Sequence, residues 1–131
     1  MREKAVIIDD DRITLKIIEK ALTELGLEVL SAEDGMEGLD LIQTQKPFLV
    51  ISDMLLPKLH GLELCRRIRE NDITKDIKIV LMSAVYKGPM FERDINTSGA
   101  DYFIKKPLDI PELVKLVEES RPEAAGAESD S

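Results

Sequence analysis

The sequence predicts an α/β fold in which a parallel β-sheet is covered by helices on both faces. Three observations lead to this class. Five strand-sized apolar runs alternate along the chain with segments of helical periodicity, which is typical of strand–helix–strand units. The runs 5–8 and 48–51 are apolar at every position, as strands buried on both faces are. The chain of 131 residues has the length of one domain with a single core.

The predicted strands are short and rich in Val, Ile, Leu and aromatic residues. Helix-length segments separate them, so the connections are crossovers, and crossovers between parallel strands are nearly always right-handed. Alternation of strands and helices in this way implies a parallel sheet with helices on both faces. The five strands are expected at Ala5–Ile8, Leu27–Leu30, Phe48–Ile51, Ile77–Met82 and Tyr102–Ile104.

Three helices are predicted between the first four strands. The first follows Asp11, a suitable N-cap, and stops at Gly26; the second ends before Pro47, and the third follows Gly61. Apolar residues recur in them at steps of three and four: Leu15, Ile18, Leu22 and Leu25; Met36, Leu39 and Ile42; Leu64, Cys65 and Ile68.

Two further helices are predicted in the last third of the chain. A weaker segment lies within residues 88–99, and a clearer helix starts at Asp109, with Glu112 three residues later as in a capping box. Residues 121–131 contain no large apolar side chain, so we expect a folded domain over residues 1–120 and a disordered acidic tail or linker over 121–131.

Composition excludes several classes of protein. The net charge of −8 argues against direct binding to nucleic acid, whose phosphates need a basic footprint. One Cys and one His argue against a disulfide and against zinc sites built from Cys or several His. Because the apolar runs are too short to span a bilayer or form a signal peptide, no membrane contact and a cytoplasmic location are expected.

Polar residues follow four of the five predicted strands. Asp9–Asp11, Ser52–Asp53, Ser83–Ala84 and Lys105–Pro107 would share the carboxyl edge of a parallel sheet, where such folds bind ligands. Clustered carboxylates repel one another unless a cation such as Mg²⁺ joins them, and a carboxylate can form an aspartyl phosphate. A lysine and a hydroxyl can bind phosphoryl oxygens. Each group alone also fits a cap, turn or loop; only their joint placement is specific.

In these residues the sequence resembles the receiver domain of two-component response regulators. The resemblance covers about residues 4–119 and implies a flavodoxin-like (βα)5 three-layer sandwich with strand order 2-1-3-4-5. The motifs that carry it are Val6–Asp11, Asp53–Leu64, Leu81–Ala84 and Gly99–Pro107.

The resemblance implies a role for each residue of the site. Asp53 would be the phosphoacceptor. Asp10, Asp53 and the backbone carbonyl of Leu55 would bind Mg²⁺, with Asp9 acting through a water. Ser83 would be the switch hydroxyl, Lys106 the phosphoryl-binding lysine and Phe103 the rotating aromatic residue, and the peptide bond before Pro107 would be cis.

Three positions depart from the family's usual pattern. Leu55 and Val85 occupy positions that tune the phosphoryl lifetime, and neither side chain can orient an attacking water, so we expect slow self-dephosphorylation. His60 stands where the family usually has Asp and is expected to be an exposed loop residue.

Cys65 is expected to be a buried small hydrophobe.

By resemblance, a sensor histidine kinase or a phosphotransfer protein would donate the phosphoryl group to Asp53. The surface of the fourth helix, fifth strand and fifth helix would then change and signal to a downstream target protein or a missing effector domain. The chain would assist only its own phosphorylation and dephosphorylation. The sequence leaves open a homodimer that forms on phosphorylation, and whether the domain stands alone or is cut from a longer chain.

Other classes of protein remain as alternatives. A magnesium-dependent phosphatase with an Asp nucleophile needs a second acid two residues after Asp53, where Leu55 stands. A flavodoxin-like cofactor binder needs a Ser-, Thr- or Gly-rich loop after the first strand, where three aspartates stand. A pseudo-receiver would keep the fold as an interaction module without the chemistry.

Overall fold

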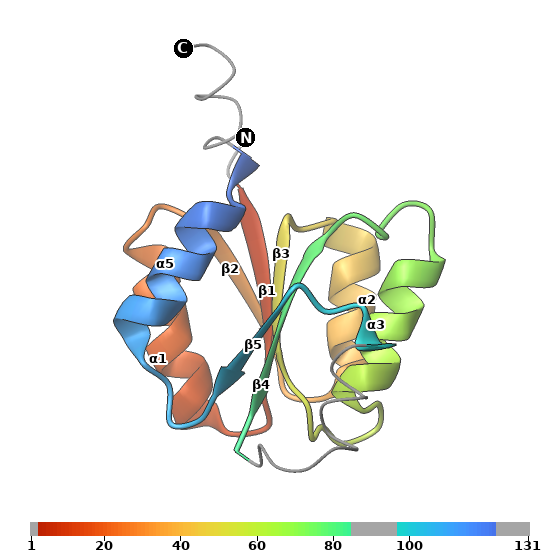
Figure 1. The fold of residues 1–131 in the computed structure, drawn as a ribbon, viewed down its shortest axis with the longest axis horizontal. Coiled ribbons are helices and arrows are strands. Elements are labelled where there is room, and N and C mark those ends of the chain that lie inside the picture. The colour runs from red at the N-terminus through yellow and green to blue at the C-terminus, as the bar shows by residue number, and fades with distance from the viewer. Residues whose placement is uncertain (1–2, 85–96, 123–131) are drawn as a thin grey trace.

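Five parallel strands form one sheet in the order β2-β1-β3-β4-β5 in the computed structural model, which describes residues 3–84 and 97–122 (Figure 1). The predicted parallel sheet and its strand order are therefore confirmed. The strands are β1 (Lys4–Ile8), β2 (Glu28–Ala32), β3 (Leu49–Asp53), β4 (Lys78–Ser83) and β5 (Tyr102–Lys105).

Helices cover both faces of this sheet, so the fold has three layers. Figure 1 shows α1 and α5 on one face and α2 and α3 on the other. The helices are α1 (Arg12–Thr23), α2 (Gly35–Gln45), α3 (Gly61–Glu70) and α5 (Ile110–Ser120). Most of the helix expected within residues 88–99 lies outside the described residues, as does Val85.

Alternation along the buried strands divides the core between the two faces. In β1, Val6 and Ile8 pack with α2 and α3, whereas Ala5 and Ile7 pack with α1 and α5. All four side chains are fully buried. The continuous apolar run of β1 is thus explained by a strand that contacts helices on both sides.

Aspartate side chains cap the predicted helix starts. The Asp11 carboxylate accepts a hydrogen bond from the Ile13 amide, and Asp109 accepts one from the Glu112 amide, as predicted. Asp34, which the sequence analysis did not single out, caps α2 in the same way. Such caps satisfy amides in the first turn that have no partner within the helix.

Strand boundaries differ from the sequence prediction by one or two residues, and the end of β3 is the difference that bears on the site. β3 continues to Asp53, because this segment keeps its parallel pairing with β4 up to the pair Asp53–Met82. Asp53 is therefore held by the sheet. At the other end of the chain, Arg121 binds Glu3 and the carbonyl oxygen of Leu25, so the contacts of the domain reach one residue into the expected tail. Residues 123–131 lie outside the described part.

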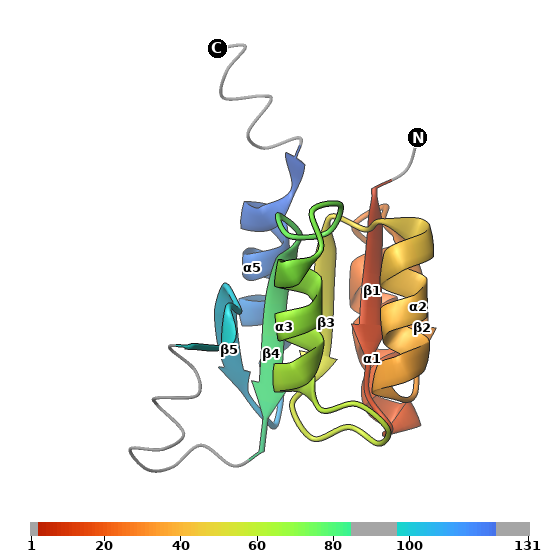
Figure 2. The ribbon, with the colours of Figure 1, turned by 90° about the vertical axis from the view of Figure 1, so that its right-hand side faces the viewer.

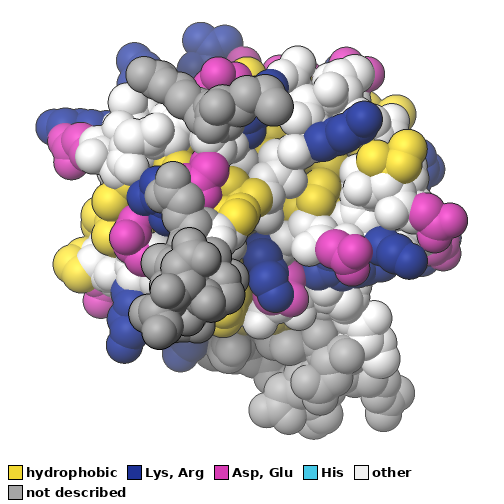
Figure 3. Space-filling model, turned by 90° about the horizontal axis from the view of Figure 1, so that it is seen from above, with side chains coloured by type: hydrophobic (Ala, Val, Ile, Leu, Met, Phe, Trp, Pro, Cys, Tyr) yellow, Lys and Arg dark blue, Asp and Glu magenta, His cyan; other side chains and the backbone are white. Residues whose placement is uncertain are grey.

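The two ends of the sheet are seen in different views. Viewed from the side in Figure 2, the strands point toward the loops that follow β1 and β3. The opposite end, seen in Figure 3, has basic and acidic side chains interspersed around hydrophobic ones. Among the described residues, no helix combines the length and apolar character that crossing a bilayer requires.

Candidate functional site

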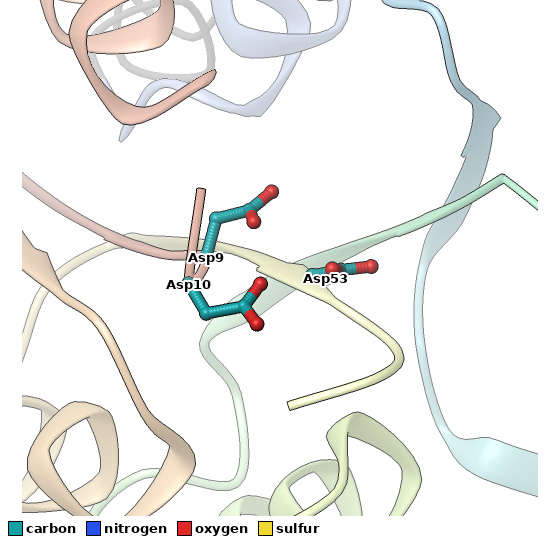
Figure 4. Close-up of side chains that lie close together, drawn as sticks. All are labelled: Asp9, Asp10 and Asp53. Carbon is teal, nitrogen blue, oxygen red and sulfur yellow. The ribbon is translucent and has the colours of Figure 1, made fainter. Parts of the chain in front are cut away.

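Three aspartates converge at the carboxyl edge of the sheet (Figure 4). Asp9 and Asp10 follow β1, and Asp53 ends β3, the neighbouring strand. One carboxylate oxygen from each lies within 4.8 Å of those of the other two. Asp9 is fully buried, Asp53 is nearly so, and Asp10 is exposed. The cluster therefore has a buried floor and one carboxylate open to solvent.

Lys106 is the cation of this cluster. Its Nζ lies 2.7 Å from Asp9 Oδ2 and 3.3 Å from Asp53 Oδ2. The other Asp9 oxygen accepts a hydrogen bond of 2.9 Å from the Asp11 amide. The buried carboxyl group of Asp9 is thus hydrogen-bonded at both oxygens, which a polar group away from water requires.

The surroundings of Asp53 disfavour its charge. Burial raises the pKa of Asp53, and the neighbouring carboxylate of Asp9 raises it further, against the opposing effects of Lys106 and of the Leu55 amide. Burial also opposes the charge on Lys106, but the hydrogen bond to Asp9 and the charges of both aspartates raise the pKa of Lys106 above its ordinary value. Lys106 therefore remains an ammonium.

The cluster has the donors and the charge that a hard divalent cation needs. Three carboxylates and one ammonium leave two negative charges when all are ionised, and every acceptor is oxygen. These properties match Mg²⁺, which prefers one or two carboxylates together with water and phosphate oxygens. The residues therefore fit the metal that the resemblance implies.

Ser83 and Phe103 lie on the strands beside the cluster. Ser83 is buried and ends β4, and its carbonyl oxygen accepts a hydrogen bond of 3.0 Å from the Lys106 amide. Phe103 pairs with Leu81 and packs, half-buried, against the core under α2 and α3. The peptide bond between Lys106 and Pro107 is cis.

The remaining predicted residues surround the site without joining the cluster. Leu55 is 64% exposed, in the loop after β3. The Asp11 carboxylate accepts from Thr14 and Ile13, which lowers the pKa of Asp11 and keeps this group at the helix cap. His60 is exposed before α3 and makes no side-chain cap bond. Cys65 is fully buried, and burial raises the pKa of its thiol to about 12.

Two features of the site were not predicted from the sequence. One is the direct ion pair between Asp9 and Lys106, which are 97 positions apart. The other is the attachment of the loop after β3 to α2, where the Gly35 amide donates to the Pro57 carbonyl oxygen at 3.1 Å and Lys58 lies 3.4 Å from Asp34. No local pattern signals either contact.

Comparisons with known proteins agree with this geometry. The family model "Response regulator receiver domain" matches residues 5–118. The response regulator MprA of Mycobacterium sp. (strain KMS) is 34% identical over 115 residues, which are 87% of this chain and 48% of MprA. This chain thus spans about half the length of that relative.

Solved structures share the fold. The receiver domain of the Francisella response regulator 1452 superposes with a TM-score of 0.81 at 28% identity, covering 90% of this chain and 95% of that one. The receiver domain of the sensor histidine kinase PA1611 from Pseudomonas aeruginosa PAO1 superposes with a TM-score of 0.81 at 22% identity. The match covers 91% of this chain and 97% of that one. That structure has a magnesium ion coordinated in its active-site cleft. The sequence match over residues 5–118, carried by a fold that brings the acidic cluster together, shows that this chain belongs to the response regulator receiver domain family of two-component signalling.

Proposed function

We propose that Asp53 accepts a phosphoryl group and that the domain transmits this event as a change of surface. The observation that carries the proposal is the convergence of Asp9, Asp10 and Asp53 with the ammonium of Lys106. A carboxylate next to a cation and a metal-binding set of oxygens has the parts that phosphoryl transfer to an aspartate needs.

Asp10, Asp53 and the backbone carbonyl of Leu55 would hold Mg²⁺, with Asp9 acting through a bound water. When bound, Mg²⁺ neutralises charge on the phosphoryl oxygens. Two observations support this assignment: Asp10 is exposed, whereas Asp9 is buried with both oxygens bonded to protein groups. The magnesium ion in the PA1611 receiver domain is consistent with it.

The side chains around Asp53 would then respond to the added charge. A phosphoryl group adds about −1.5 to −2 charge at neutral pH. Lys106 already lies 3.3 Å from Asp53 and would bind a phosphoryl oxygen. Ser83 ends the neighbouring strand β4, and its hydroxyl would donate a hydrogen bond to a second phosphoryl oxygen. Movement of Ser83 would let Phe103 turn inward. This would alter the surface formed by the fourth helix expected from the sequence, β5 and α5.

Partners follow from the same proposal. The phosphoryl donor would be a sensor histidine kinase or a phosphotransfer protein in the cytoplasm, and the output would go to a target protein or to an effector domain of a longer chain. Ile13 and Ile17, exposed on α1 after Asp9–Asp11, and Leu55, exposed in the loop after β3, supply apolar contact area. A homodimer that forms on phosphorylation belongs to the same proposal. The domain turns over no separate substrate.

Leu55 would also lengthen the life of the aspartyl phosphate. Its side chain is exposed beside the phosphoacceptor and offers no hydrogen-bond donor or acceptor to a water. Val85, proposed for the same role, lies outside the described residues. A phosphoryl group that is lost within seconds in the isolated chain would contradict this part of the proposal.

Phosphorylation by a small donor tests the function directly. The full chain is incubated with Mg²⁺ and acetyl phosphate, and its intact mass is followed with time. We expect one phosphoryl adduct that is absent in Asp53→Asn. Asp11→Asn is the matched control, because asparagine caps a helix as well as aspartate does and residue 11 is not in the cluster.

Each other outcome has a definite meaning. A chain that takes no adduct under these conditions is a pseudo-receiver, and the proposal fails. Continuous release of phosphate from several phosphate esters would instead support the phosphatase alternative. An adduct that persists in Asp53→Asn would place the phosphoacceptor elsewhere.

A further inference from the structure

Arg69, at the end of α3, joins three segments that are separate in the sequence. Its guanidinium donates to the carbonyl oxygens of Lys75 at 2.8 Å, Ile77 at 2.6 Å and Gly99 at 2.8 Å. It also donates to Asp101 Oδ2 at 2.8 Å. The Arg69 and Asp101 side chains are only 25% and 29% exposed, so this set of bonds is partly shielded from water. Arg69 thus connects the turn before β4 with the residues that enter β5.

Asp101 carries this connection into the sheet. Its amide donates to the Ile79 carbonyl oxygen at 2.9 Å, and its Oδ2 accepts from the Ile79 amide at 2.8 Å. The first regular pair of the two strands, Val80 with Tyr102, follows immediately. The Asp101 carboxylate therefore binds both Arg69 and the β4 backbone. Hydrogen bonds to ionised groups are the stronger kind, so this end of β5 is well anchored.

β5 needs such an anchor. It has four residues, and it lies at the edge of the sheet with β4 as its sheet neighbour. A slip of one residue would turn every side chain to the opposite face and shift the strand by about 3.3 Å. Gly99 permits the close approach of Arg69: its φ is +88°, and a Cβ there would lie 3.1 Å from Arg69 Cγ.

The register of β5 decides where Lys106 stands. Lys106 directly follows β5, and its amide bonds to Ser83 at the end of β4. Its Nζ reaches Asp9 and Asp53 at 2.7 and 3.3 Å. A slip of about 3.3 Å would exceed the tolerance of both contacts.

We propose that Arg69 and Asp101 are positioning residues: they lock the register of β5 and thereby place Lys106 in the phosphorylation site. The effect of this lock on phosphorylation rests on the proposed function, in which Lys106 binds the phosphoryl group of Asp53. The lock itself is a property of the unphosphorylated chain. Neither residue touches the acidic cluster.

The functional test compares two arginines of the same helix. Arg69→Gln removes the lock, whereas Arg66→Gln removes an arginine whose partners, within residues 3–84 and 97–122, are Glu63 and Glu70 on the exposed face of α3. With acetyl phosphate and Mg²⁺, we expect Arg69→Gln to slow phosphorylation by about ten- to a hundredfold, the range that a misplacement of about 1 Å produces. Arg66→Gln should stay near wild type. Arg69→Lys should recover part of the rate, because it restores the charge but not the fork of donors.

A double-mutant cycle shows whether Arg69 acts through Lys106. In a Lys106→Ala background, Arg69→Gln should cause no further loss, because the group that it positions is gone. The affinity for Mg²⁺ alone should not fall in Arg69→Gln, since Asp9 and Asp10 follow β1, Asp53 ends β3, and displacement of the Lys106 ammonium removes no carboxylate from the cluster. An equal loss in both backgrounds, or a parallel loss of Mg²⁺ affinity, would overturn the proposal.

Hydrogen exchange tests the lock without any phosphoryl donor. In Arg69→Gln we expect faster amide exchange in β5 and at Lys106, with exchange in β1 and β3 unchanged. Asp101→Asn, which keeps an acceptor for Ile79 but loses the ion pair, serves if Arg69→Gln does not fold, and should give the same pattern. Unchanged exchange in β5 overturns the lock. Faster exchange in a chain that never takes a phosphoryl group supports the lock and refutes the proposed function.

Discussion

The carboxylate of Asp53 is held where its charge is unfavourable. The end of β3 buries it, and the nearby carboxylate of Asp9 adds repulsion that Lys106 only partly offsets. Active sites often carry such groups, because the surroundings are adapted to a ligand or a reaction and not to the empty state. Without a bound cation, Asp53 is therefore expected to lower the stability of the fold.

Asp53→Asn should stabilise the chain at neutral pH in the absence of Mg²⁺. The folded-state pKa of Asp53 is raised, so its ionised form costs stability above that pKa, and the cost disappears as the pH falls below the ordinary value of an aspartate. We expect a gain of about 1 kcal/mol in the free energy of unfolding, within the range found for optimising substitutions at such sites.

Urea unfolding of both proteins at neutral pH and at about pH 4, near the ordinary pKa of an aspartate, measures this difference. The gain should shrink at the lower pH. Asp40→Asn, at an exposed position on α2, is the control for loss of one negative charge from the whole chain. A destabilised Asp53→Asn would mean that the ion pair with Lys106 outweighs burial and repulsion.

At the scale of elements, the loop after β3 is fastened to the start of α2. The Gly35 amide bonds to Pro57, and Lys58 pairs with Asp34. A Cβ on residue 35 would lie 2.0 Å from the carbonyl oxygen of Leu59, a distance that backbone movement alone could relieve. This loop contains Leu55, whose backbone carbonyl is proposed to bind Mg²⁺. The position of the loop therefore affects both the stability of the fold and the proposed metal site.

Gly35→Ala should therefore destabilise the fold by about 1–3 kcal/mol, the usual cost of forcing an extra methyl group into a packed contact. Urea unfolding measures the loss. Met36→Ala, at the adjacent and largely exposed position, should change stability much less. An equally stable Gly35→Ala would show that the loop can move away from α2 at little cost.

At the scale of the whole molecule, the acidic cluster exists only in the folded state. Asp9, Asp10 and Asp53 come together because β1 and β3 are neighbours, although 43 positions separate Asp10 from Asp53 in the chain. A cation that binds this cluster and not the unfolded chain must stabilise the fold by mass action.

We expect Mg²⁺ at one hundred times its dissociation constant to raise the free energy of unfolding by about 2.7 kcal/mol. Thermal or urea unfolding with magnesium chloride, compared with sodium chloride of equal ionic strength, measures the effect. Asp11→Asn should keep it, and an Asp10→Asn, Asp53→Asn double variant should lose it. Equal stabilisation by both salts would show that screening of the net charge of −8, and not site binding, is responsible.

The sequence was sufficient where the signal is local. Apolar runs predicted all five strands to within a few residues, and Asp11 and Asp109 marked the starts of α1 and α5. The order of the strands came from the resemblance to receiver domains, since periodicity along the chain does not say which strands are neighbours. The site residues were predicted from their positions after strands together with that resemblance.

By itself, then, the sequence determined the elements, the edge of the sheet where Asp9, Asp53 and Lys106 would meet, and the family. Tertiary structure alone decided that Lys106 lies closer to Asp9 than to Asp53, that burial raises the pKa of Asp53, and that Arg69 anchors β5 through Asp101. Hydrophobic patterns and caps arise between residues a few positions apart. Distances, burial and long-range hydrogen bonds depend on segments that only the packed fold brings together.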